Sequence, residues 1–371
     1  MDVDSGIAPQ PEQFRQLCGQ GNVIPVYREI LADTETPVSA YLKIRQQGGY
    51  SFLLESVEGG ERAARYSFLG TGPTAVFRAR GHQVTIDEGA GRVRTFAADP
   101  VAAFRQFMAT YRSVHLPELP RFTGGAVGYL GYDGIRLVED LPDTCTDDLG
   151  LDDMVFAVFE TIVAFDNLRH TALLITHADL RHGADPETAY IEAGDRLGQL
   201  EDLLNTAAPR GALPTGEPLG TVRSNTAHDE YIEQVERCLE YIRAGDIFQV
   251  VFSQRFEAEV RADPVDIYRV LRTVNPSPYM FHIDLDGVQV LGASPEILVR
   301  VEDGVLDVRP IAGTRARGAT PEADAAIEAE QLAAAKDRAE ILYAGETVGK
   351  PVPLDTDRLY RAYVSAMNQL E

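Results

Sequence analysis

The stretch Tyr279-Met-Phe-His-Ile-Asp-Leu-Asp-Gly-Val-Gln-Val-Leu291 predicts a β-hairpin and sets the character of the fold. Two strand-like runs flank the Asp286-Gly287 pair, which is a strong hairpin signal because both residue types tolerate positive φ angles. Glu296 follows the second run, directly behind a proline that fixes the local backbone. A further run, Val305 to Arg309, leads to Gly313-Thr314, where the glycine lets a ligand approach the main chain. We therefore expect a pocket at these strand ends.

The rest of the chain alternates amphipathic helices with short strands and has no βαβ rhythm. Short β-branched or aromatic runs between glycine-rich turns predict an antiparallel meander in the first half. Thr226, with Asp229 three positions later, is expected to begin a helix, and a strand is expected over Ile247–Arg255. More helices are expected where a capping residue precedes a proline, at Thr36-Pro37, Asp99-Pro100, Asp185-Pro186 and Asp263-Pro264. These patterns predict an α+β fold.

The chain has 371 residues and is therefore longer than a typical domain built around a single hydrophobic core. Residues 206–224 are rich in proline and glycine and have little hydrophobic pattern, as is typical of a linker. We therefore expect an N-terminal region over residues 1–205 and a second region over residues 225–371.

The formal net charge of −23 argues against a nucleic acid or an anionic membrane as the main partner, because both would be repelled. The three cysteines Cys18, Cys145 and Cys238 lie far apart without metal-ligand spacing, which favours reduced thiols in a cytoplasmic protein. The acidic start of the chain lacks the basic and apolar regions of a signal peptide. No run approaches the roughly 18 apolar residues of a membrane span.

Several separated motifs, taken in order, resemble the large subunit of anthranilate synthase, a chorismate-using enzyme. The resemblance spans roughly residues 24–340 and rests on Leu53-Leu-Glu-Ser56, Arg65-Tyr-Ser-Phe-Leu-Gly70, Gly125-Ala-Val-Gly-Tyr129, Gly245-Asp-Ile-Phe-Gln-Val-Val251, Asn275 to Phe281, Gly292-Ala-Ser-Pro-Glu296 and Pro310-Ile-Ala-Gly-Thr314. It implies antiparallel sheets packed face to face with outer helices. It also implies that chorismate and ammonia are converted to anthranilate and pyruvate, with the ammonia supplied by a glutamine amidotransferase subunit.

The resemblance implies a catalytic acid and a substrate-binding turn. A positioned carboxylic acid is needed because hydroxide is a poor leaving group, and by resemblance that acid is Glu296. The alternative is a glutamate at a strand end that faces water. Gly313 and Thr314 correspond to residues that contact chorismate, with an ordinary turn as the alternative.

Two positions distinguish the chorismate enzymes from one another. Relatives that add water carry a lysine where this chain has Gln249, and relatives that aminate the other ring carbon carry a lysine where it has Ala312. Glutamine and alanine can neither activate water as a lysine does nor form its covalent adduct. Both positions therefore favour attack by ammonia and the anthranilate product.

The resemblance also implies a magnesium site. Lys336-Asp-Arg-Ala-Glu340 is similar to the helix whose final glutamate binds Mg²⁺ in the family, and Mg²⁺ prefers carboxylate and water oxygens. The alternative is a solvated pair of Lys336 and Glu340, four residues apart on one helix face.

A feedback site for L-tryptophan is implied by Leu53-Leu-Glu-Ser56 together with Pro278-Tyr-Met280. A glutamate and a serine hydroxyl can hold an amino group, while apolar side chains enclose an indole. The alternative is a set of core strand residues. The predicted inhibitor-binding residues are Leu54, Glu55, Ser56, Pro278, Tyr279 and Met280.

Beyond Glu340 the chain departs from the family pattern, because Ile341-Leu-Tyr-Ala-Gly-Glu346 stands where the family has a histidine and a run of polar residues. Glu371 lies at the end of a segment that only faintly resembles the helix carrying a second magnesium glutamate. One alternative is therefore a catalytically inactive protein that binds tryptophan or the amidotransferase. Another is aminodeoxychorismate synthesis, which Ala312 disfavours.

Overall fold

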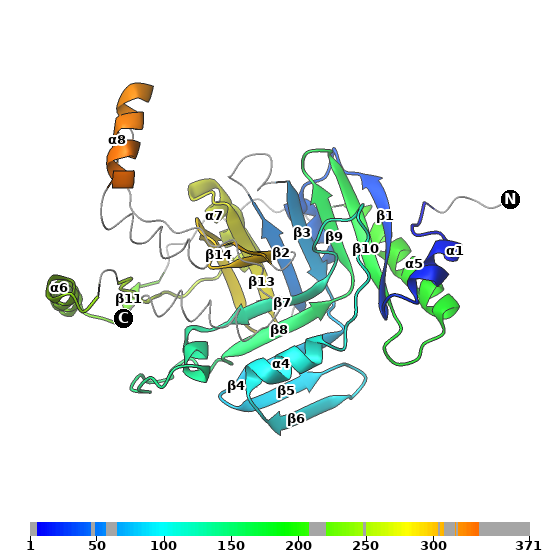
Figure 1. Ribbon diagram of the computed structural model, residues 1–371, viewed down its shortest axis with the longest axis horizontal. Coiled ribbons are helices and arrows are strands. Elements are labelled where there is room, and N and C mark those ends of the chain that lie inside the picture. Colours follow the sequence, from blue (N-terminus) through cyan, green and yellow to red (C-terminus); the bar gives the residue numbers. More distant parts are fainter. Residues whose placement is uncertain are drawn as a thin grey trace. The chain divides into compact units, whose positions relative to one another are not determined.

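The computed structural model describes residues 6–45, 49–56, 65–207, 220–247, 250–302, 305–307, 316 and 318–333 (Figure 1). Contacts divide the chain into two compact units. Unit 1 comprises Met1–Thr215 with Ala262–Pro295, and unit 2 comprises Gly216–Arg261 with Glu296–Glu371. The hairpin thus belongs to unit 1, although it follows the predicted linker. The division of the chain at residues 206–224 stays a prediction.

Unit 1 is built on a seven-stranded antiparallel sheet with the strand order β1-β10-β9-β3-β2-β13-β14. Its strands are β1 (Val23–Leu31), β2 (Tyr50–Glu55), β3 (Tyr66–Thr71), β9 (Ile162–Asp166), β10 (Thr171–Asp179), β13 (Tyr279–Leu285) and β14 (Gln289–Ser294). The predicted hairpin is confirmed as β13 and β14, with φ of 57° at Asp286 and 102° at Gly287. Strand β13 pairs with β2, which is more than two hundred residues earlier in the chain.

A second antiparallel sheet of unit 1 has five strands in the order β6-β5-β4-β8-β7. They are β4 (Ala75–Arg80), β5 (Gln83–Asp87), β6 (Val93–Ala97), β7 (Gly125–Leu130) and β8 (Met154–Phe159). Because strand side chains alternate between faces, β8 contributes to two cores. Val155, Ala157 and Phe159 join the core of the seven-stranded sheet, whereas Met154 and Val158 pack with Phe107 of helix α4 (Pro100–Met108). The two sheets therefore pack against each other through one face of β8.

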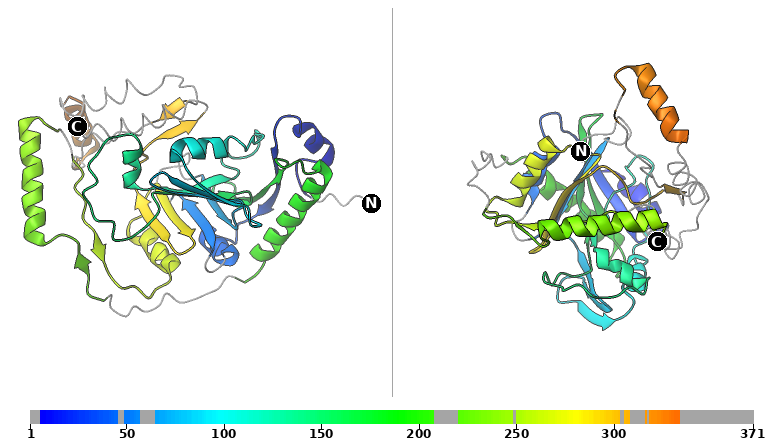
Figure 2. Two further views of the ribbon diagram at one scale, coloured as in Figure 1. Left: turned by 90° about the horizontal axis from the view of Figure 1, so that it is seen from below. Right: turned by 90° about the vertical axis from the view of Figure 1, so that its left-hand side faces the viewer.

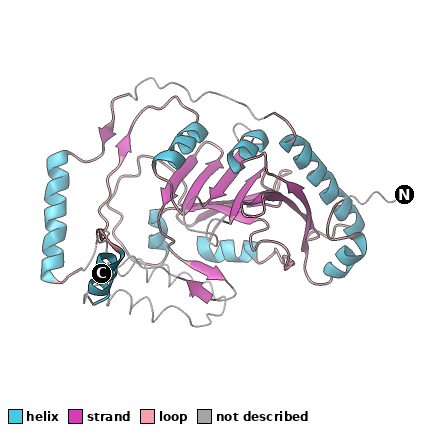
Figure 3. Cartoon of the chain, turned by 90° about the horizontal axis from the view of Figure 1, so that it is seen from above, coloured by secondary structure: helices cyan, strands magenta, loops and turns pink. Residues whose placement is uncertain are grey.

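Helices of unit 1 cover the outer face of the seven-stranded sheet, as Figures 2 and 3 show. They are α2 (Pro37–Ile44), α5 (Pro186–Leu204) and α7 (Pro264–Val274), with the short α1 (Pro11–Leu17) against α5. The predicted helix starts are confirmed, because the side chains of Thr36, Asp99 and Asp185 each accept a hydrogen bond from a first-turn N–H group. The 3-10 helix η1 (Tyr132–Leu137) completes the unit. The α+β prediction is confirmed.

Unit 2 contains helix α6 (His228–Ala244), the strand pairs β11 (Arg223–Ser224) with β12 (Phe256–Glu257) and β15 (Arg300–Glu302) with β16 (Val305–Asp307), and helix α8 (Pro321–Ala333). The predicted helix is confirmed as α6, although its N-cap is Ala227 rather than Thr226. One prediction is wrong here. The strand expected over residues 247–255 is absent from residues 250–255, and the strand that follows, β12, consists of Phe256 and Glu257. A strand-like sequence forms a strand only where a neighbouring strand offers hydrogen bonds.

Among the described residues, no helix is both long enough and apolar enough to cross a membrane.

Candidate functional site

The residues predicted to bind tryptophan meet at the ends of two neighbouring strands of unit 1. The antiparallel register of β2 and β13 sets Met280 opposite Glu55 and Phe281 opposite Leu54. Ser56 directly follows β2, and Pro278 directly precedes β13. The hairpin turn determines this arrangement, since it fixes which residues of β13 can pair with β2.

The sheet divides these residues between its two faces. Glu55 and Met280 lie on the face that the helices cover, because Tyr268 of α7 contacts Glu55. Leu54 lies on the opposite face together with Phe52, whose ring centroid is 4.7 Å from that of Phe159 in the five-stranded sheet. Tyr279 shares this second face by the same alternation. The six residues are therefore adjacent in the sheet but do not line a single surface.

Glu55 is held in a buried ion pair with α7. Its side chain is 3% exposed, and the Arg272 Nε lies 2.9 Å from the Glu55 Oε2. The Arg272 Nη2 also donates to Oε1 at 3.0 Å, and the Tyr268 hydroxyl donates to Oε2 at 2.7 Å. Burial raises the pKa of Glu55 above its usual value, while Arg272 and Tyr268 oppose that shift. Both carboxylate oxygens therefore have donors from one helix.

A second buried polar cluster lies on the same face, further along the two strands. The Tyr41 hydroxyl of α2 is 2.7 Å from the Ser51 Oγ and 3.0 Å from the His282 Nδ1. Burial lowers the pKa of His282 to about 4, so the ring is neutral near neutral pH, and burial raises the pKa of Tyr41 to about 12. The ring centroids of Tyr268 and His282 lie 5.9 Å apart, which connects the two clusters.

Sequence reasoning did not identify Tyr41, Tyr268, Arg272 or His282. The available signal was the polar side chains at alternate positions of β2 and β13, such as Ser51, Glu55 and His282. This alternation is typical of a strand with one face in water. In this structure helices cover that face, and their polar groups bond to Ser51, to the Nδ1 of His282 and to both oxygens of Glu55.

The predicted catalytic acid lies in unit 2. Glu296 is exposed in a bend two residues after the end of β14. Gln249, Gly313, Thr314 and the metal ligand Glu340, as well as Glu371, lie outside the described residues. Within the described ranges, no group of three or more His, Cys, Asp and Glu side chains is arranged to hold a metal ion.

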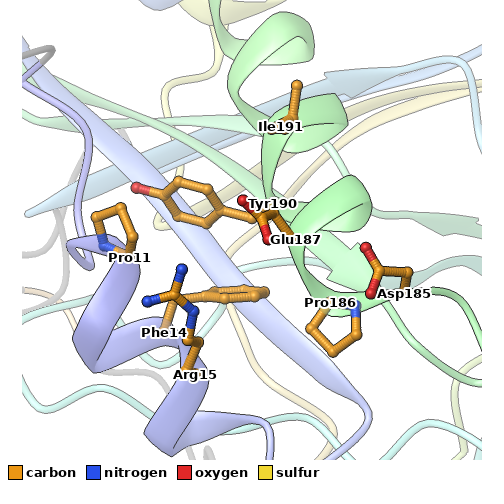
Figure 4. A pocket seen from close by; sticks show the side chains of 8 residues that line it. All are labelled: Pro11, Phe14, Arg15, Asp185, Pro186, Glu187, Tyr190 and Ile191. Atoms are coloured by element: carbon orange, nitrogen blue, oxygen red, sulfur yellow. The ribbon is translucent and has the colours of Figure 1, made fainter.

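A shallow groove lies elsewhere in unit 1, between α1 and the start of α5 (Figure 4). Phe14 and Tyr190 form its aromatic floor with ring centroids 4.8 Å apart, and Arg15, Asp185 and Glu187 lie around it. None of the residues predicted from the motifs lines this groove.

Comparison with known proteins identifies the class to which this fold and these motifs belong. The sequence profile of the chorismate binding enzymes matches residues 49–347. Anthranilate synthase component 1 of Acetivibrio thermocellus is 40% identical over 338 residues, covering 90% of this chain and 68% of that protein. The same component of Pseudomonas aeruginosa is 44% identical over 339 residues, covering 89% and 68%. The chain belongs to the family of chorismate binding enzymes.

Within that family, the structural comparison agrees with the sequence comparison. The crystal structure of anthranilate synthase component I from Streptococcus pneumoniae superimposes with a TM-score of 0.62 at 32% identity, covering 84% of this chain and 65% of that one. The predicted resemblance to the large subunit of anthranilate synthase is thereby confirmed. The chain spans about two thirds of the length of these relatives.

Proposed function

We propose that the chain acts as the large subunit of an anthranilate synthase, a lyase that converts chorismate and ammonia to anthranilate, pyruvate and water in tryptophan biosynthesis. The observation that carries the proposal is the 40–44% identity to component 1 proteins over about nine tenths of the chain. Ammonia reaches the site from a glutamine amidotransferase subunit. The three cysteines, all of them free thiols, support a cytoplasmic location.

The proposed chemistry assigns a separate task to each predicted residue. Ammonia attacks the ring carbon beside the carboxylate as the distant hydroxyl leaves, and Glu296 protonates that hydroxyl so that it departs as water. Elimination of the enolpyruvyl group as pyruvate then yields the aromatic amine. Gly313 and Thr314 contact chorismate, while Gln249 and Ala312 favour ammonia as the nucleophile over water or a lysine adduct.

Glu340 is the proposed Mg²⁺ ligand. Mg²⁺ would neutralise the ring carboxylate of chorismate when bound, and a carboxylate is the ligand type that this ion prefers.

L-Tryptophan is the proposed feedback inhibitor, bound at Leu54, Glu55, Ser56, Pro278, Tyr279 and Met280. The pairing of β2 with β13 supports this proposal, because it brings the two motifs together from distant parts of the chain. Apolar contact with Leu54 and Tyr279, which share one face of the sheet, and polar groups at the strand ends suit an amino acid with an indole side chain.

The direct test is fluorescence detection of anthranilate from chorismate with ammonium and Mg²⁺. We expect turnover by the wild-type chain and a loss of roughly 10²- to 10⁴-fold in kcat for Glu296→Gln, which keeps the shape but cannot donate the proton. Equal rates for the two proteins would refute the role of Glu296. An aromatic amine with the amino group at the other ring position would indicate aminodeoxychorismate synthesis.

A binding protein without turnover is the second candidate function. The exposure of Glu296 favours it, because a general acid works best where water is excluded, whereas the inhibitor residues lie in the well-packed unit 1. Calorimetry separates the candidates. Tryptophan binding with no anthranilate formed supports the binding protein, and tryptophan binding together with turnover supports the enzyme.

A further inference from the structure

The Glu55 carboxylate faces away from the surface that Leu54 and Tyr279 share. Successive side chains of a strand point to opposite faces, so Glu55 cannot reach the Leu54 side unless β2 changes its register. Its two oxygens already accept hydrogen bonds from Tyr268 and Arg272, and its side chain is 3% exposed. A ligand ammonium beside Leu54 and Tyr279 therefore has no route to this carboxylate.

Arg272 lies in the last turn of α7, directly before the segment that carries half of the proposed inhibitor site. Helix α7 ends at Val274 with Asn275 as its C-cap, and residues 275–278 then lead into β13. Ser277 within this connection is buried. The Glu55–Arg272 ion pair thus ties the end of β2, which is followed by Ser56, to the helix end that places Pro278.

We propose that Glu55 is a positioning residue, which through Arg272 and Tyr268 fixes the spacing between Ser56 and the segment 275–280 without contacting the ligand ammonium. The proposal rests on the inhibitor site proposed above, and it makes the geometry of that site depend on helix α7. A buried carboxylate with matched donors suits this task, because two hydrogen bonds and an ion pair to one helix fix its geometry.

The test compares L-tryptophan with indole-3-propionate, which keeps the indole and the carboxylate but lacks the ammonium. Dissociation constants are measured by calorimetry on the full chain for the wild type, Glu55→Gln, Arg272→Gln and Arg272→Lys. We expect the first two variants to weaken both ligands by the same factor, about 10- to 100-fold, because the whole site is displaced. The affinity ratio of the two ligands then stays within about twofold of wild type. Arg272→Lys keeps the charge and recovers part of the affinity.

A direct contact between the Glu55 carboxylate and the ligand ammonium predicts a different pattern of affinities. In that case Glu55→Gln weakens tryptophan but leaves indole-3-propionate unchanged, so the affinity ratio collapses, and Arg272→Gln changes neither ligand. That pattern would overturn the proposal. Arg269→Gln is the matched control, because Arg269 lies on the same helix and pairs within it, with Asp266 at 2.7 Å.

Hydrogen exchange supplies a measurement that needs no ligand. Both Glu55→Gln and Arg272→Gln are expected to speed amide exchange over residues 275–280, whereas Arg269→Gln leaves that segment at its wild-type rate. Unchanged exchange in all three variants would overturn the positioning role. If the wild type binds neither ligand but exchange responds as expected, the inhibitor site is refuted and the structural tie stands.

Discussion

Helices α5 and α6 carry apolar residues at the same helical spacing, yet their surroundings differ. In α5 the stripe Ala189, Ala193, Leu197, Leu200 and Leu204 is buried against the seven-stranded sheet. In α6 none of the residues is buried, and Ile232, Leu239 and Ile242 are 46%, 44% and 38% exposed. An amphipathic pattern thus predicts that a helix forms and which side is apolar, but burial requires a packed surface opposite that side.

The largest expected effect is the difference in unfolding free energy that is lost when one leucine of each helix is replaced by alanine. Leu197→Ala removes a fully buried side chain and should lower the free energy of unfolding by about 2–5 kcal/mol, as a cavity in a core does. Leu239→Ala in α6 should lower it by less than about 1 kcal/mol, because that side chain is already half in water. Urea unfolding followed by circular dichroism measures both. Equal losses would show that the α6 stripe is packed in solution.

Acid should destabilise unit 1 through His282. Its folded pKa of about 4 lies below the ordinary value of 6.5, so the unfolded chain binds the proton more tightly between these values. Stability is therefore lost as the pH falls from about 6.5 to 4, by at most about 3 kcal/mol. The raised pKa values of Glu55 and Asp284 act in the opposite direction.

The measurement is the slope of the unfolding free energy against pH. His282→Gln should flatten the slope between pH 6.5 and 4 even though it lowers stability at neutral pH. His228→Gln, at the exposed start of α6, is the matched control and should keep the wild-type slope. A slope that is the same in all three proteins would contradict the burial of a neutral His282.

Tyr41→Phe tests the hydrogen bonds in the covered face of β2 and β13. The substitution removes the hydroxyl that joins Ser51 and His282 while keeping the ring, and should cost about 1–3 kcal/mol because buried polar partners are left without it. Tyr132→Phe in η1 is the control, since Tyr132 is 72% exposed. If Tyr41→Phe lowers the free energy of unfolding by less than Tyr132→Phe does, water replaces the missing hydroxyl.

The smallest expected effect is a gain in the stability of helix α6. Ala227 has the extended backbone of an N-cap but offers no side-chain acceptor, in contrast to Asp185 of α5. Ala227→Ser should stabilise α6 by about 0.5–1 kcal/mol, seen as slower amide exchange in its first turn. Ala227→Val is the control and gives no protection, because it has no oxygen to accept the bond.

Local sequence determined the elements that depend on near neighbours. The hairpin over residues 279–291 was predictable because a positive φ at Asp286 and Gly287 is a property of those two residues. The caps at Thr36, Asp99 and Asp185 were predictable because each acts on an N–H group within its own first turn. The motif resemblance located Glu55, Ser56 and Met280, but it did not tell which face of the sheet each occupies.

Tertiary structure alone decided the burial of Glu55 and His282. The partners of Glu55 are 213 and 217 residues away in the chain, and Tyr41 lies 241 residues from His282. It also decided that residues 250–255 form no strand and that the α6 stripe stays uncovered. A turn or a cap is stabilised by atoms a few residues apart, whereas burial and strand pairing depend on surfaces that only the complete fold brings together.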